Sequence, residues 1–201
     1  ADLYRDREDY ASALMLLDEI LAGDPEALEA LHRIAELHRL EGDLDQSVEV
    51  FQTIVDQAVK RNRLDEAIAA AERILELRPE AIEHRERVIN LYVQAGRADI
   101  ALGRIHQLID TLEKQQNLEA LIRTLQTALE IAPDRADLII KLAAALENSG
   151  ATDQALTQRM KAAERFLQAG RFGEAIEQLR SVLRVHGEDV SAMSLLADAL
   201  A

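Results

Sequence analysis

The chain has 201 residues, of which 48% are hydrophobic and 30% are charged, and its net charge at neutral pH is −14. Because nucleic-acid binding depends on clustered Lys and Arg, this acidic balance argues against a nucleic-acid partner and favours a basic or neutral one. The absence of cysteine excludes disulfides and thiolate chemistry, and no apolar run reaches the length of a membrane span.

Taken in chain order, the apolar residues predict a series of short amphipathic helices. Residues 1–6 have the pattern of the end of a helix. Residues 9–22 carry an apolar stripe at three- and four-residue steps, which predicts the next helix. We expect Asp24 to cap the helix that follows and Pro25 to lie in its first turn, where a missing N–H costs nothing.

A tight turn at Gly42 is expected to end that helix, because glycine adopts the left-handed conformation cheaply. Asp43 then has the position of an N-cap, with a third helix over residues 44–60. After a turn near Asn62 the helical pattern restarts and continues to residues 189–201, which resemble a helix interrupted midway.

The pattern repeats with a period of 54 residues. The three prolines and three of the glycines keep this interval: Pro25, Pro79 and Pro133, with Gly42, Gly96 and Gly150. We predict copies at about residues 9–62, 63–116 and 117–170, and a partial copy at 171–201. Because repeat units pack mainly on their neighbours, these copies predict a single solenoid over residues 1–201. It would hold about ten complete helices with a stub at each end, as expected for a fragment of a longer chain.

One position recurs at the same phase of alternate helices, at intervals of 34 and 20 residues, and is small in all copies but one. Its members are Ala13, Ser47, Ala67, Ala101, Leu121, Ala155 and Ala175. A small side chain allows two helix axes to approach closely, so we predict that this line of residues is buried.

The order of residues in 28–55 (LEALHRIAELHRLEGDLDQSVEVFQTIV) resembles that of the tetratricopeptide repeat (TPR) family. The matching residues are Leu31, Ala35, Gly42, Leu44, Ser47 and Phe51, and residues 89–105 and 135–156 show the same order. The resemblance covers essentially the whole chain. It implies an all-α fold, an α-solenoid in which antiparallel helices form a right-handed superhelix.

The 20-residue steps depart from the family pattern, as if residues 44–60 served as the second helix of one pair and the first of the next. Three helices per copy leave two alternatives open. Either the helices form a continuous zigzag, so that successive copies run in opposite directions, or the third helix is tilted; we favour the zigzag. Two residues also depart from the pattern: Arg159 occupies a site that is usually apolar, and Gly187 stands where a fourth proline is expected.

The sequence predicts no catalytic site, no metal and no cofactor. The five histidines are scattered without a metal-ligand spacing, and neither a nucleophile motif nor a glycine-rich phosphate loop is present. Acids four residues before a base recur in three copies: Glu29 with Arg33, Glu83 with Arg87, and Asp137 with Lys141. We interpret them as helix-stabilising pairs. The alternative is a cationic ladder for an acidic peptide, as in the carboxylate clamps of some TPR proteins.

Positions that change character between copies, on the helix after each proline, are the candidates for ligand binding. They are His32, Glu36, Glu86, Asn90, Ile140 and Ala144. If they line one groove, it is acidic and polar at one end and apolar near Ile140. Such a groove would suit a peptide with basic residues and apolar anchors.

We therefore predict a non-enzymatic scaffold that binds a protein or peptide segment on a curved helical surface. A regulatory or sensor solenoid within a larger protein, such as a transcription regulator, is the alternative. A cytoplasmic location fits a chain without cysteine. Open ends with apolar stripes also predict end-to-end self-association.

Overall fold

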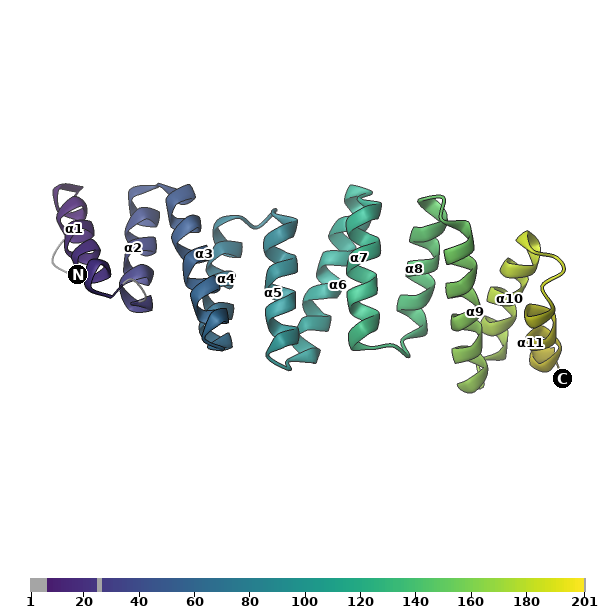
Figure 1. Cartoon of the computed structure of the whole chain (residues 1–201). Helices are drawn as coiled ribbons and strands as arrows, with labels where there is room; N and C mark the ends of the chain where they lie inside the picture. Colours follow the sequence, from purple (N-terminus) through teal and green to yellow (C-terminus); the bar gives the residue numbers. More distant parts are fainter. Residues whose placement is uncertain (1–6, 25–26, 201) are drawn as a thin grey trace. The chain divides into compact units, whose positions relative to one another are not determined.

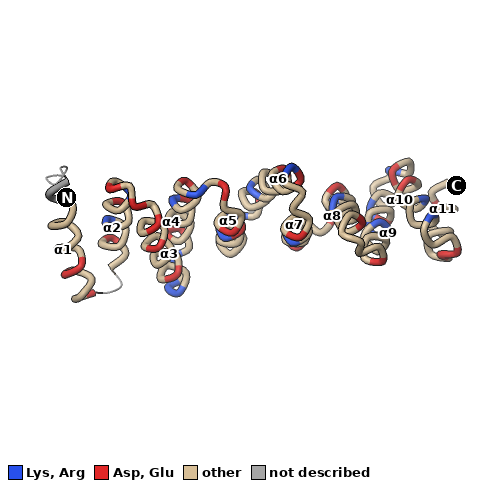
Figure 2. Tube along the Cα trace, turned by 90° about the horizontal axis from the view of Figure 1, so that it is seen from above, with Lys and Arg blue, Asp and Glu red and all other residues tan. Residues whose placement is uncertain are grey.

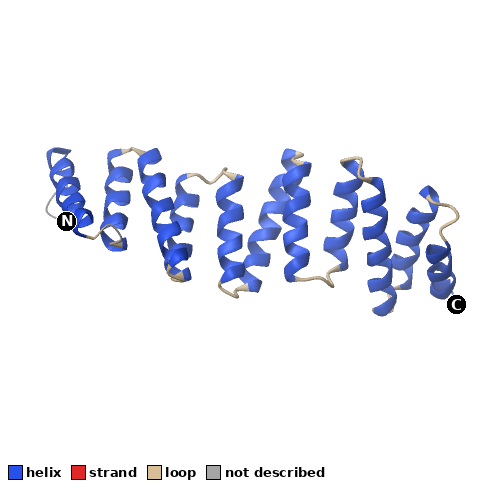
Figure 3. Cartoon of the chain, in the orientation of Figure 1, coloured by secondary structure: helices blue, strands red, loops and turns tan. Residues whose placement is uncertain are grey.

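The computed structural model describes residues 7–24 and 27–200, and within these ranges the chain forms helices joined by short turns, with no strand (Figures 1 and 3). The helices are α1 (Arg7–Gly23), α2 (Leu28–Glu41), α3 (Leu44–Lys60), α4 (Leu64–Leu77), α5 (Ile82–Gln94), α6 (Ala98–Gln115), α7 (Leu118–Ile131), α8 (Ala136–Asn148), α9 (Thr152–Gln168), α10 (Phe172–Val185) and α11 (Val190–Leu200). The predicted all-α fold is confirmed. The helix end expected at residues 1–6 lies outside the described residues.

The chain divides into two compact units, Ala1–Ala101 and Leu102–Ala201. The first unit contains α1 to α5 and the start of α6, and the second contains the rest of α6 and α7 to α11. The single continuous solenoid over residues 1–201 stays a prediction.

Two kinds of turn join the helices, and the first kind is centred on a residue in the left-handed conformation. At Gly42, φ is 87°; its N–H donates to the Arg39 carbonyl, and the Asp43 N–H donates to the His38 carbonyl. This pair of hydrogen bonds satisfies the last carbonyls of a helix. Positive φ recurs at the equivalent turns, at Asn62, Gly96, Gln116, Gly150 and Gly170. The glycine turns expected from the sequence are confirmed.

Gln116 is the least suitable residue among these turns, because a side chain with a Cβ is strained in the left-handed region and asparagine tolerates it better. Its φ is 55°. We therefore expect Gln116→Gly to raise the free energy of unfolding by about 1 kcal/mol. Urea titration followed by circular dichroism measures the change. Gln115→Gly, still inside α6, should destabilise; an unchanged or lower midpoint for Gln116→Gly would contradict the assignment.

The second kind of turn contains Pro79 between α4 and α5, Pro133 between α7 and α8, and Gly187 in the equivalent place between α10 and α11. Pro79 and Pro133 do not lie in the first turn of a helix. Each occupies the second position of a four-residue turn, closed by the Ala81 N–H to the Arg78 carbonyl (3.2 Å) and by the Arg135 N–H to the Ala132 carbonyl (3.3 Å). The fixed φ of proline suits this position.

The predicted cap at Asp24 is wrong. The Asp24 carbonyl accepts from the Ala27 N–H at 3.1 Å, and Ala27 rather than Asp24 precedes α2. Pro25 itself lies outside the described residues. A 54-residue copy thus contains two left-handed turns and one proline turn. Its 34-residue step crosses the proline turn and one left-handed turn, and its 20-residue step crosses the other left-handed turn.

Within each unit successive helices are antiparallel, and the connecting turns lie at alternate ends (Figure 1). Ion pairs join helices that are two apart: Glu36 of α2 with Arg73 of α4 (2.5 Å), and Asp56 of α3 with Arg87 of α5 (2.9 Å). In the second unit α9 likewise contacts α11. Alternate helices therefore form two layers, which is the zigzag favoured from the sequence. In the first unit α2 and α5 consequently run in opposite directions.

The predicted line of small residues is buried, as expected. Its exposed fractions are 9% at Ala13, 7% at Leu121 and 0% at the other five positions. The Ser47 hydroxyl donates to the Ala35 carbonyl at 2.8 Å, which places α3 directly against α2. These close contacts fix the helix spacing on which the surface sites depend.

Candidate functional site

The structure distributes the six predicted binding residues over three helices. His32 and Glu36 lie on α2, Glu86 and Asn90 on α5, and Ile140 and Ala144 on α8. In the first unit α3 and α4 come between α2 and α5. Because α2 and α5 also run in opposite directions, equivalent positions of the two copies do not form one ladder. The sequence argument that aligned them is wrong for this unit.

Two of the six residues, His32 and Glu36, make contacts that stabilise the fold. The His32 ring meets the buried Phe51 ring edge-on, with 5.3 Å between the ring centres and 89° between the planes. The Glu36 carboxylate accepts from Arg39 Nε at 2.7 Å and from Arg73 Nη2 at 2.5 Å. Arg73 also pairs with Glu76. This network binds α2 to α4.

The Glu36 network sets the pKa of its carboxyl group. Burial by itself raises the pKa, but the hydrogen bonds and charges of Arg73 and Arg39 together outweigh it and hold the pKa of Glu36 below its usual value. A lowered pKa means that Glu36 stabilises the fold above the pKa of the unfolded chain. This contribution is lost as the pH falls through the folded-state pKa.

We therefore expect the free energy of unfolding to fall less steeply for Glu36→Gln than for the parent between about pH 5 and about pH 3. Urea unfolding at a series of pH values measures both slopes. Glu49→Gln, at an exposed site on α3, serves as the control and should keep the parental slope. Equal slopes for the parent and Glu36→Gln would contradict the role of the network.

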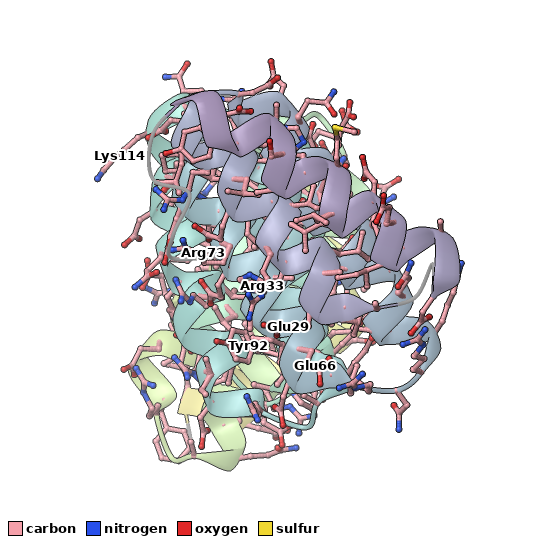
Figure 4. The ribbon with its side chains drawn as sticks, turned by 90° about the vertical axis from the view of Figure 1, so that its left-hand side faces the viewer. Glu29, Arg33, Glu66, Arg73, Tyr92 and Lys114 are labelled. Atoms are coloured by element: carbon pink, nitrogen blue, oxygen red, sulfur yellow. The ribbon has the colours of Figure 1, made fainter. Side chains whose placement is uncertain are left out.

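The three predicted acid–base pairs behave differently from one another. Arg33 pairs with Glu29 as expected (Nε to Oε1, 3.1 Å), and the two side chains lie together on α2 in Figure 4. Arg87 pairs with Asp56 instead of Glu83, and Lys141 with Glu113 at 2.5 Å instead of Asp137. The last two cations therefore join helices two apart. Since all three cations are paired, the structure offers no support for a cationic ladder.

A groove of about 490 Å³ lies in the second unit, between α8, the end of α9 and the start of α10. Its apolar wall includes Ile140 and Phe166, and the buried side chain of Gln178 also lines it. Ile140, one of the six predicted residues, thus lines this groove. Ala144, one turn further along α8, is half-buried and is not part of the lining.

A chain of hydrogen bonds through three helices holds the polar side of this groove. Arg159 of α9 binds the Glu147 carboxylate of α8 in two places, Nε to Oε1 at 2.6 Å and Nη2 to Oε2 at 2.8 Å. Arg159 Nη1 donates to Gln178 Oε1 of α10 at 2.6 Å. Since Gln178 accepts this bond through its carbonyl oxygen, its amide NH₂ is left as a hydrogen-bond donor.

The hydrogen bonds between Arg159 and Glu147 are the main cause of the pKa shifts of both residues. The hydrogen bond from Arg159, opposed by burial and assisted by the charge of Arg159, holds the pKa of Glu147 below its usual value. The hydrogen bond to Glu147 raises the pKa of Arg159, with smaller contributions from the charges of Glu147 and Glu177. Both groups therefore stay ionised near neutral pH, and the polar chain stays intact.

Three further arginines line the groove, and each has an acidic partner in the lining. Arg135 binds Asp137 in two places (2.9 and 2.8 Å), Arg165 binds Asp134 at 2.9 Å, and Arg171 binds Glu174 at 2.8 Å. The Arg171 guanidinium also lies over the Phe166 ring, 4.6 Å from its centre. The rim is thus charged but largely neutralised.

Sequence reasoning missed most of this groove. The available signal was Arg159, which stands where the other two copies have Phe51 and Ile105. Those two residues are fully buried, so a charged residue at the same phase requires polar partners. Glu147 and Gln178 supply them, but their approach depends on how α8, α9 and α10 pack.

Charge is divided unevenly between the units. Residues 1–101 hold 12 Lys and Arg against 23 Asp and Glu, a net charge of −11, whereas residues 102–201 hold 11 against 14, a net charge of −3. In the first unit acidic positions recur on each of α2 to α5 and are not gathered at one place (Figure 2). The groove therefore belongs to the less acidic unit.

The described residues contain no group of three or more His, Cys, Asp or Glu side chains that could hold a metal ion. Nor is any helix of the described ranges long and apolar enough to cross a membrane.

Among solved structures, the chain is similar to the MamA protein (19% identity, TM-score 0.38, covering 76% of this chain and 90% of that one). It is also similar to the C-terminal part of a TPR repeat-containing protein from Cytophaga hutchinsonii (14% identity, TM-score 0.38, 99% and 92%). A tetratricopeptide repeat protein from Parabacteroides merdae has 14% identity and a TM-score of 0.28, with 98% and 94% covered. These similarities are weak. No curated protein matches the chain.

The sequence profiles of protein families give the stronger result. One tetratricopeptide repeat profile matches residues 4–62, and a second one with the same description matches residues 160–201. Together they cover slightly more than half of the 201 residues, at both ends of a chain whose described residues form helices joined by short turns. The chain therefore belongs to the tetratricopeptide repeat family.

Proposed function

We propose that this chain binds a segment of a partner protein in the groove between α8, α9 and α10. Membership of the TPR family supports the general part of this proposal, because repeats of this kind typically serve as non-enzymatic scaffolds for protein–protein interaction. The place of binding is argued from the residues that line the groove.

The observation that carries the proposal is that one groove combines an apolar wall with a hydrogen-bond donor held in a fixed orientation. The half-buried Ile140 offers apolar surface, and Gln178 offers an amide NH₂ whose orientation Arg159 fixes. Binding sites for peptides combine such apolar contacts with a few placed polar groups. A preformed site also lowers the ordering cost of binding.

We expect Ile140→Asp to weaken peptide binding at least about tenfold, because it places a charge against the apolar wall. The test selects short random peptides on the parent chain by surface display and measures their affinity by fluorescence anisotropy. Ile100→Asp, at an exposed isoleucine of α6 outside the groove, is the matched control and should bind as the parent does. Equal binding by Ile140→Asp, or no enriched peptide, would refute the proposal.

Self-association and a cytoplasmic location are also part of the proposal. Exposed apolar side chains on the terminal helices support self-association: Met15, Leu16 and Ile20 on α1, and Val190, Met193 and Leu200 on α11. Sedimentation at several concentrations tests it, and a constant monomer mass would exclude it.

A cytoplasmic location fits the absence of cysteine. Fluorescence microscopy of the tagged chain in its host checks this location, and a signal outside the cytoplasm would exclude it.

A further inference from the structure

We infer that the groove selects a partner segment that carries Lys or Arg, whose cationic side chain pairs with Glu177. This inference rests on the proposed function and adds the chemistry of the partner. It comes from the balance of charges around the groove.

Four carboxylates and three arginines line the groove. Each arginine is paired with one carboxylate, Arg135 with Asp137, Arg165 with Asp134, and Arg171 with Glu174. The remaining carboxylate is Glu177, an exposed side chain on the first half of α10. Among the described residues it has no ion pair. The lining therefore carries one uncompensated negative charge.

Arg159, behind the groove, does not supply the missing cation. Its guanidinium is already held by two hydrogen bonds to Glu147 and one to Gln178. The charge of Glu177 also raises the pKa of Arg159, but less than the hydrogen bond and charge of Glu147 do, and no ion pair joins these two described side chains. The negative charge of Glu177 is thus available to a ligand.

A basic segment fits this arrangement and an acidic one does not. The methylene stem of a lysine or arginine can pack on the half-buried Ile140 while its charged end reaches Glu177. The adjacent Gln178 NH₂ can donate to a carbonyl of the same segment. An acidic segment would instead have to displace Asp134, Asp137 or Glu174 from its arginine, and each displacement leaves a carboxylate unpaired.

The test is a double-mutant cycle on the peptides enriched by the parent chain. Each enriched peptide is also made with its Lys and Arg replaced by Gln, and both forms are measured on the parent and on Glu177→Gln. We expect the basic form to bind the parent about three- to fivefold more tightly than its Gln form. This preference should disappear in Glu177→Gln and shrink in high salt.

Two variants sharpen the result. Glu164→Gln removes an exposed carboxylate of α9 outside the groove and should keep the full preference. Glu177→Lys should reverse it and favour peptides in which Asp or Glu replaces the basic residues. An unchanged preference in Glu177→Gln, or enrichment of acidic peptides by the parent, would overturn the inference.

The outcomes also separate this inference from the proposed function. If Ile140→Asp abolishes binding while Glu177→Gln keeps the preference, the groove binds a segment but not through Glu177. If Ile140→Asp binds every peptide as the parent does, the groove is not the binding site and both proposals fail.

Discussion

Replacing Phe51 with alanine is expected to lower the free energy of unfolding of the first unit by about 3 to 5 kcal/mol. The Phe51 ring is fully buried, in a core that α2, α3 and α4 share. Truncation removes this apolar contact and leaves a cavity, and it also removes the ring against which His32 packs. Urea unfolding followed by circular dichroism measures the loss.

Two controls show whether the loss comes from packing. Phe51→Leu keeps most of the volume and should cost less than about 1.5 kcal/mol, and Leu40→Ala, at an exposed site on α2, should change stability by no more than about 0.5 kcal/mol. In a repeat array the damage should stay local. Hydrogen exchange is therefore expected to accelerate in α2 to α4 and not in α8 to α10. A loss below about 1 kcal/mol for Phe51→Ala would contradict the core assignment.

Arg159→Met is expected to destabilise the second unit by about 1 to 3 kcal/mol. The substitution leaves the carbonyl oxygen of Gln178, a residue only 5% exposed, without its donor. The Glu147 side chain is 38% exposed, so water can replace part of what it loses and the cost stays below that of a fully buried pair. The change in urea midpoint measures it.

A double variant tests the same chain of hydrogen bonds, with an expected change in stability opposite to that of Arg159→Met. Arg159→Phe combined with Gln178→Ala reproduces the pair Phe51 and Ala70 of the first copy, which is apolar and buried. Because well-packed apolar residues often match or exceed a buried ion pair, we expect stability at or above that of the parent. If the double variant is less stable than Arg159→Met, the polar chain is not what destabilises the single variant.

The helices of this protein were predictable because they depend on local patterns. The apolar stripes predict α2 to α10, and the left-handed turn at Gly42 follows from the conformational freedom of glycine. The buried line that includes Ser47 and Ala67 was predictable for a related reason: a small residue at a constant phase indicates a close helix contact.

The binding residues were less predictable, because the 54-residue period was assumed to place equivalent residues on one surface. Three helices per copy reverse the direction of each following copy within the first unit, so His32 and Glu86 are equivalent in sequence and not in space. Ile140 lines the groove, and its role in binding stays a prediction. Gln178 was missed because a glutamine on a helix looks solvated until its neighbours are known.

The repeat, its helices and the family were thus predictable from the amino-acid sequence, since each follows from the spacing of residues along one chain. Which charges pair depends on the packing of the helices. Arg87 and Lys141 reach carboxylates on helices two apart, and Arg159 joins three helices around a groove. Hydrogen bonds and ion pairs act over a few ångströms, so they depend on how helices distant in sequence are brought together in space.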